Sequence, residues 1–260
     1  MLHLSPALTA YILTAAALLG LIFGSFCNAW AWRLCRGESI TRGRSHCAVC
    51  GHTLSARDLV PLLSWLLLRG KCRYCGAPIS GRYPAAELVS ALAFVSLMLR
   101  YDVTLDALRF LLLACFLLTA ALTDLEKQEI PDRLLVLSAA AALLRIPAGG
   151  WAGVKAGLLG AVAVAVPLLL FVLLADRVLG RETMGGADIK LFAVLGLHFS
   201  PALMLLLLIL ACLLGLLLAC LLRRGGKQEF PFGPAIAAAT WLTALLGAPL
   251  LRWYLSLFAF

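Results

Sequence analysis

The chain has 260 residues, of which 63% are hydrophobic and only 13% are charged, and its mean hydropathy is +0.98. A soluble domain of this size is about half apolar and a quarter charged, so this chain has too little polar surface to cover a water-soluble globule. The net charge of +9 does not indicate nucleic acid, because the basic residues gather in short segments between apolar runs. The expected surroundings are a lipid bilayer.

Eight apolar segments follow one another along the chain. They are continuous and rich in Leu and Ala, so the predicted spans are helices and not the strands of a barrel. They cover about residues 7–32, 84–100, 107–124, 132–147, 152–176, 187–199, 201–222 and 233–257. The segment 187–199 is short for a full crossing, which leaves a re-entrant helix as an alternative. The predicted fold is an all-α polytopic membrane protein with about eight transmembrane helices.

The basic residues set the expected orientation. With the N-terminus outside, eight crossings place residues 35–83, 125–131, 177–186 and 223–232 in the cytosol. These segments and their flanks hold 17 of the 22 Lys and Arg residues, as the positive-inside rule requires. The first segment reads as a retained anchor, because Arg33 and Arg36 follow it and no basic residue precedes Ala7. The expected location is a plasma membrane, crossed several times.

Two pairs of small-residue positions predict close helix packing. Gly20 and Gly24 form a G-x-x-x-G in the first segment, and Gly153 and Gly157 form another in the fifth. This spacing lets two helix backbones approach each other. It carries no catalytic meaning by itself.

The long polar segment contains two C-x-x-C pairs, Cys47 with Cys50 and Cys72 with Cys75. Each pair places two thiolates on one tight turn, and two such turns form the tetrahedral sulfur shell that Zn²⁺ prefers. Two redox dithiols are the alternative, but they need a βαβ context that is missing here. A closed shell of four sulfurs leaves no open position, so the predicted zinc is structural.

Two aspartates stand at the predicted cytosolic membrane edge. Asp124 ends the third apolar segment and Asp188 begins the sixth, which places them at the same depth. Two close carboxylates share one proton, so the ionised partner can activate water while the other polarises a peptide carbonyl. Helix-end dipoles favour the charge on Asp188 and the proton on Asp124. These residues are the predicted catalytic pair of a membrane aspartyl protease.

Structural explanations compete with this interpretation. Asp188 follows two glycines and is also suited to an ordinary helix N-cap. Asp124 could form a salt bridge with Lys127 at the membrane boundary. Asp132 and Glu87 are further carboxylates that compete for a role, although Asp132 after Pro131 suits the start of a helix.

At these residues the sequence resembles the type IV prepilin peptidases, which are bifunctional leader peptidases and N-methyltransferases. The matching stretches are Gly24–Asn28 with Arg33-Leu34, Ser64-Trp65, Arg69–Cys75, Ile79-Ser80, Arg82–Pro84 with Glu87, Asp124 with Ile130–Asp132, Gly185–Asp188, and Pro231–Pro234. Three positions depart from the family pattern. Cys35 replaces a proline, Ala187 replaces the second glycine of G-x-G-D, and the proline after Cys47 is missing.

The resemblance implies an aspartic endopeptidase that removes the short basic leader of type IV prepilins or pseudopilins. The cut falls after a glycine and before a usually aromatic residue, and the new N-terminus is then methylated with S-adenosylmethionine. The scissile segment must be extended, so we expect substrate-binding backbone at Gly185, Gly186 and Ala187 and at Pro231, Phe232, Gly233 and Pro234. The expected cofactor contacts are Gly70, Lys71 and Glu87.

This interpretation divides the chain into a first transmembrane helix at 1–34, a cytosolic zinc module at 35–83 and a peptidase core at 84–260. One competing hypothesis is a non-enzymatic membrane scaffold or transporter with a structural zinc module. A second is a peptidase that cleaves without methylating.

Overall fold

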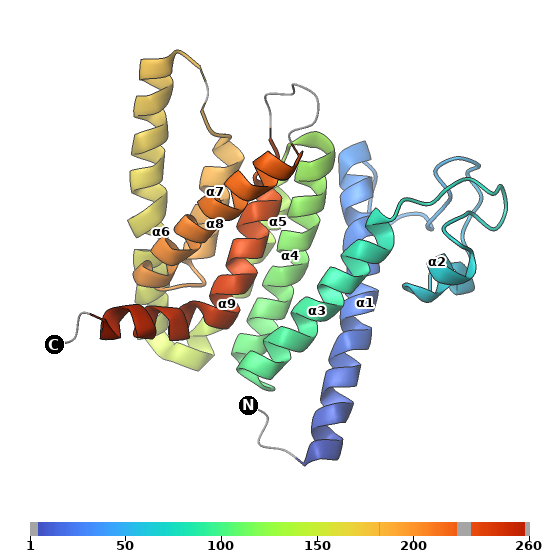
Figure 1. Cartoon of the computed structure of the whole chain (residues 1–260), viewed down its shortest axis with the longest axis horizontal. Helices are drawn as coiled ribbons and strands as arrows, with labels where there is room; N and C mark the ends of the chain where they lie inside the picture. Colours follow the sequence, from blue (N-terminus) through green and yellow to red (C-terminus); the bar gives the residue numbers. More distant parts are fainter. Residues whose placement is uncertain (1–4, 182, 223–229, 258–260) are drawn as a thin grey trace. The chain divides into compact units, whose positions relative to one another are not determined.

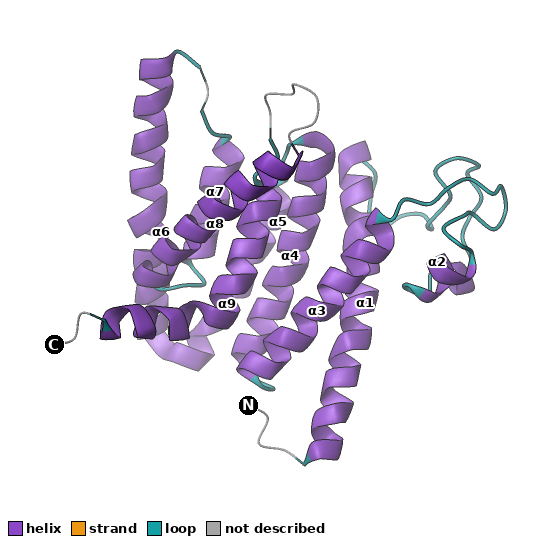
Figure 2. Ribbon diagram, viewed as in Figure 1, coloured by secondary structure: helices purple, strands orange, loops and turns teal. Residues whose placement is uncertain are grey.

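The computed structural model describes residues 5–181, 183–222 and 230–257. Within these ranges the regular structure is helical (Figure 2), apart from two isolated antiparallel bridges. The chain forms two compact units, one ending at Asp102 and the other beginning at Val103. The all-α fold expected from the sequence is confirmed.

The first unit contains α1 (Pro6–Arg36), the 3-10 turn η1 (Ala56–Asp58), α2 (Leu63–Leu67) and α3 (Arg82–Tyr101). Helix α1 packs against α3 through the first small-residue pair. A Cβ atom on Gly20 would lie 2.6 Å from the Ala91 Cα, and one on Gly24 would lie 2.7 Å from the Glu87 Cα. Larger side chains would force the two helices apart, so the predicted close packing is confirmed.

The polar segment between α1 and α3 folds as two similar knuckles. His46 pairs with Thr53 in the first knuckle and Lys71 pairs with Pro78 in the second, each by one antiparallel bridge. The buried Arg33 guanidinium at the end of α1 holds the incoming loop by donating to four carbonyls, those of Ser39, Ile40, Arg42 and Gly43. Apart from η1 and α2, this segment is therefore held by single bridges and by hydrogen bonds from the end of α1.

The second unit contains α4 (Leu105–Lys127), α5 (Asp132–Ala142), α6 (Arg145–Leu179), α7 (Gly186–Gly196), α8 (Pro201–Leu222) and α9 (Gly233–Ser256). Helix α4 packs against α5 and α9, while α6 packs against α7 and α8. Figure 1 shows the C-terminal end of α4 and the N-terminal ends of α7 and α9 at the same end of this unit. Three chain positions far apart in sequence therefore meet at one place.

Six described helices are long and apolar enough to cross a membrane: α1, α3, α4, the 149–179 part of α6, α8 and α9. All eight expected apolar segments are helical, but α5 and α7 have only 11 residues each. Eleven residues rise about 16 Å, roughly half of a bilayer's hydrocarbon core. The expected count of eight crossings is therefore not confirmed.

Candidate active site and metal centre

Asp124 lies in the last turn of α4, where its side chain is buried with 5% exposure. Its carboxylate accepts a hydrogen bond of 2.7 Å from the backbone N–H of Gly233, the first residue of α9. First-turn N–H groups of a helix have no partner within the helix and favour a negative charge. In the described part of the chain, Asp124 therefore bonds to the α9 amide and not to Lys127.

Gly233 fits its position because it has no side chain. A Cβ atom there would lie 2.8 Å from the Asp124 Oδ2 and 3.1 Å from its Cβ. The preceding Phe232 fixes this end of α9 against two other helices. Its ring lies 6.4 Å from the Phe192 ring of α7, and a Cβ on Gly215 of α8 would lie 2.6 Å from it.

Asp188 stands in the first turn of α7, one turn before Phe192. The helix N-cap is Gly185, so the alternative in which Asp188 is itself the N-cap is wrong. Gly185 leaves room beside the Asp188 carboxylate, since a Cβ there would lie 3.4 Å from the Asp188 Oδ2. Asp188 is partly desolvated and lies close enough to feel the charge of Asp124. The two predicted catalytic residues therefore lie within electrostatic range of each other.

Asp132 and Glu87, the two competing carboxylates, have other partners. Asp132 begins α5 and forms a salt bridge of 3.0 Å with Lys190 in α7, where both side chains are exposed. Glu87 belongs to α3 in the first unit. The expected substrate-binding positions Gly185, Gly186 and Ala187 lie at the start of α7 beside Asp188. Those at 231–234 lie at the start of α9 beside Asp124, and their contact with substrate stays a prediction.

The sulfur atoms of Cys47, Cys50, Cys72 and Cys75 all lie within 4.8 Å of one another. The Cys47 and Cys75 sulfurs are 3.9 Å apart, close to the edge of about 3.8 Å expected for a tetrahedron with Zn–S bonds of about 2.3 Å. His46 packs against Trp32 and His52 against Tyr74. The donor set therefore fits a metal bound by four thiolates.

The thiols influence one another's protonation. Backbone N–H groups of Cys50 and Val49 lower the pKa of Cys47 to about 6. The Ala77 amide acts in the same direction on Cys75, but burial and the three neighbouring sulfurs together raise its pKa to about 11. Four thiolates this close repel one another, so a bound cation would stabilise the fully ionised cluster.

A carboxylate that sequence reasoning missed organises the space between the two knuckles. Asp58 accepts hydrogen bonds from the Ser55 hydroxyl and amide, from Arg73 and from Tyr74. Its bond to the Arg73 Nε is 2.7 Å long. The Ser55 hydroxyl and the Arg73 guanidinium hold the pKa of Asp58 well below its usual range. One signal was available, because Asp58 is the only acidic residue between the two cysteine pairs.

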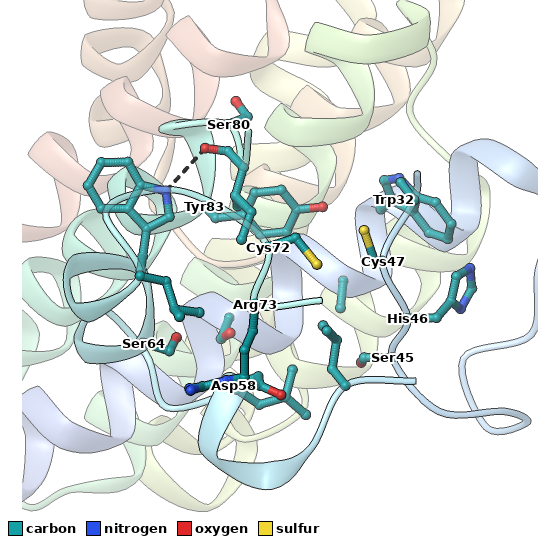
Figure 3. A pocket seen from close by; sticks show the side chains of 18 of the residues that line it. Trp32, Ser45, His46, Cys47, Asp58, Ser64, Cys72, Arg73, Ser80 and Tyr83 are labelled. Carbon is teal, nitrogen blue, oxygen red and sulfur yellow. Dashed lines mark hydrogen bonds and ion pairs between the residues drawn. The ribbon is translucent and has the colours of Figure 1, made fainter. Parts of the chain in front are cut away.

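A cavity of about 530 Å³ lies within the first unit, between the module that carries the four cysteines, α1 and the start of α3. Figure 3 shows Trp32, Tyr83, Cys47, Cys72, Asp58 and Arg73 around it. Trp65 of α2 also lines the cavity and donates its indole N–H to the Ile79 carbonyl at 3.2 Å. The volume lies in the range of small-molecule sites, which combine apolar and aromatic walls with a few polar groups.

The three expected cofactor contacts are placed differently. Glu87 lines the cavity, whereas Gly70 and Lys71 are not among its lining residues. Gly70 adopts a left-handed conformation with φ 68° and supports the cavity wall from behind. A Cβ atom there would lie 3.0 Å from the Trp65 ring. The aromatic residues of the wall were not predicted as site residues.

Glu87 also fixes a strained turn. Its carboxylate is buried and accepts a bond of 2.7 Å from the backbone N–H of Leu62. Leu62 has φ 58° and ψ −52°, and the Leu63 N–H bonds to the Pro61 carbonyl across it. These angles define a γ-turn with a positive φ at its central residue. This conformation is rare and strained, and it persists only where the surrounding structure holds it. The turn starts α2 and so places Trp65.

Comparison with known proteins gives the family of the chain. The family model for the bacterial peptidase A24 N-terminal domain matches residues 18–101, and that for the type IV leader peptidase family matches residues 111–220. The chain belongs to the type IV leader peptidase family. The family and the six apolar helices together indicate a protein of the bacterial inner membrane. No solved structure matches the chain.

Several relatives match over most of their length. A prepilin leader peptidase/N-methyltransferase of Bacillus subtilis is 36% identical over 253 residues, covering 95% of this chain and 99% of the relative. One of Aeromonas hydrophila is 36% identical, covering 83% of this chain and 76% of the relative. A type 4 prepilin-like proteins leader peptide-processing enzyme of Escherichia coli is 34% identical, covering 88% and 92%.

Proposed function

We propose that this protein is a membrane aspartyl endopeptidase that removes the basic leader of prepilins or pseudopilins and then methylates the new N-terminus. The observation that carries the proteolytic half is the meeting of Asp124 with the α9 amide, next to Asp188 at the start of α7. Two adjacent carboxylates, one stabilised as an anion, are what water activation requires. The names of the relatives support the substrate class.

The α9 amide suggests how the proton is shared. The ends of α4 and α7, taken by themselves, favour the charge on Asp188. The bond from Gly233 favours the charged form of Asp124 directly. We therefore assign the base to Asp124 and the acid to Asp188, although the pair titrates as one unit.

The cleavage step follows from this assignment. Asp124 takes a proton from water while the oxygen attacks the scissile carbonyl carbon, and Asp188 donates its proton to the carbonyl oxygen. The tetrahedral intermediate then loses the C–N bond: the leaving amine takes the proton held by Asp124, and one hydroxyl of the intermediate returns its proton to Asp188 as the carbonyl re-forms. The leader ends in a carboxylic acid, and the mature chain starts with a free amine.

The cavity of the first unit is the proposed site for S-adenosylmethionine. Its lining offers the rings of Trp32, Trp65 and Tyr83 and the carboxylate of Glu87, and both kinds of group favour a cation such as a sulfonium. When bound, the cofactor supplies an electrophilic methyl group to the amine. Zinc is proposed as the ion of the four-cysteine cluster, where it holds the knuckles that form the cavity wall.

The substrate and the two sites are expected to meet on the cytosolic side. A prepilin is an apolar helix with a basic leader, so its cleavage point lies at the inner membrane boundary. The excess of Lys and Arg in the segments between the apolar runs supports an orientation with the zinc module and the aspartates on that side. The N-terminus is then outside.

The deciding experiment uses the full chain in proteoliposomes with a candidate prepilin, reading cleavage and N-terminal mass. Asp124→Asn and Asp188→Asn should each reduce cleavage by at least about 10³-fold, because the pair no longer holds both a base and an acid. Asp132→Asn is the matched control, since it removes an exposed carboxylate at the same end. Retained cleavage in either catalytic variant would end the proposal that the two aspartates form the catalytic pair, whereas no cleavage by the unaltered protein would favour the scaffold or transporter hypothesis.

A further inference from the structure

The short helix α7 is held at the end opposite to Asp188. Leu197, which caps its C-terminus, and the following His198 present backbone carbonyls that the helix itself leaves without partners. Arg145 of α6 donates to the Leu197 carbonyl at 3.3 Å, and Arg109 of α4 donates to the His198 carbonyl at 3.0 Å. Arg109 is buried and also pairs with Asp106 at 2.7 Å.

His198 adds a third connection. Its side chain is only 2% exposed, and its Nε2 lies 3.0 Å from the Ser138 carbonyl of α5. A carbonyl can only accept, so this nitrogen carries the proton. The end of α7 is therefore bonded to three other helices: α4, α5 and α6.

Glycines bring the backbones into direct contact at the same place. A Cβ atom on Gly157 of α6 would lie 2.6 Å from the Leu197 carbonyl oxygen, and one on Gly160 would lie 2.8 Å from the Gly196 carbonyl oxygen. Gly153, one turn earlier, leaves space for the side chain of Arg145. Packing this close fixes a helix better than contacts between long side chains do.

We propose that Arg109, Arg145 and His198 form a distal clamp that sets the position of α7 along its axis, and so brings Asp188 to Asp124. They are positioning residues, and the inference rests on the proposed function of the aspartate pair. Near Asp188, α7 is held by the packing of Phe192 against Phe232, while the Lys190–Asp132 pair is exposed and such pairs contribute little. Eleven helical residues rise only about 16 Å, so a displacement at the clamp reaches the carboxylate.

The experiment compares Arg145→Gln, Arg145→Lys and the control Arg252→Gln in the full chain. Among the described residues, Arg252 of α9 donates to the Ala248 carbonyl of its own helix. Arg145→Gln should lower kcat for leader cleavage about ten- to 100-fold at a KM within about twofold, because small misplacements of reacting groups cost that much. Arg145→Lys should restore part of kcat, and the control should match the unaltered protein.

Hydrogen exchange of the same variants separates positioning from general instability. Arg145→Gln should speed exchange at 188–196 while α4 and α9 keep their protection. Unchanged kcat, or a loss of protection throughout the second unit, would overturn the clamp. Neither result would affect the proposed function, which fails only if Asp124→Asn or Asp188→Asn still cleaves.

Discussion

The two units build their sites by different physical means. In the first, the described residues between 38 and 81 include only two buried ones, Gly70 and Cys72, so the zinc module depends on its sulfurs and on hydrogen bonds. In the second, Asp124 and its partner amide are enclosed by packed helices. The site in the first unit should lose its activity when the metal is removed. The site in the second unit should lose its activity when an added side chain displaces one of the helix ends.

Removal of the metal should produce the largest difference between the activities of the two sites. Chelation of the purified protein, or Cys72→Ser, should lower methyl transfer to a pre-cleaved pilin by at least about 100-fold, because a small module held by zinc unfolds without it. Leader cleavage should stay within about threefold, since no described cysteine of the cluster lies in the second unit. Metal content and both activities are measured on the same sample.

The control for this experiment is Cys212→Ser, which alters an exposed cysteine of α8 outside the cluster. It should change neither metal content nor either activity. An equal loss of cleavage and methylation on chelation would show that the two sites are not independent.

A side chain at Gly233 tests the helix-end site. Gly233→Ala should lower cleavage about ten- to 100-fold, because its Cβ would meet the Asp124 carboxylate and shift the base away from its geometry. Methylation of a pre-cleaved pilin should be unchanged. Gly149→Ala on α6 is the matched control, as its Cβ would enter open space, and full activity of Gly233→Ala would remove the amide from the proposed mechanism.

The sequence predicted those parts of both sites that leave a local pattern. The cysteine spacing is such a pattern, and so are Asp124 and Asp188 at the ends of apolar runs. The bond from Gly233 to Asp124 could not be predicted in this way, because it joins residues 109 positions apart and depends on how three helix ends meet. The proton assignment based on isolated helix ends missed it for the same reason.

The cavity was also beyond the sequence pattern. Trp32 and Tyr83 belong to helices on either side of the module, and Trp65 reaches the wall only through the turn at Leu62. Glu87 was predicted as a cofactor contact, but its bond to the Leu62 amide was not. Hydrophobic periodicity locates elements, whereas a pocket is formed by the loops between them.

Substitutions at Glu87 distinguish its two roles. Glu87→Gln keeps an oxygen that can accept from Leu62 but removes the negative charge, so the KM for S-adenosylmethionine should rise about tenfold while the module stays folded. Glu87→Ala should also release the turn and lower kcat for methylation by a further ten-fold or so. A Gln variant with unchanged KM would limit Glu87 to holding the turn.

The smallest expected effect is at Asp58, whose network joins the loop before α2 to the second knuckle. Its lowered pKa means that the charge on Asp58 contributes stability above the ordinary pKa of an aspartate and loses that contribution only as pH falls through the lower, folded value. Asp58→Asn should therefore shorten the half-time of zinc retention against a chelator by about two- to threefold, by the same factor from about pH 6 to 8. In both proteins the half-time of zinc retention should shorten as the pH is lowered, because the cysteines must be deprotonated to bind. A ratio between the two proteins that changed steeply within this range would mean that Asp58 titrates there, and that the bonds from Ser55 and Arg73 do not hold its charge.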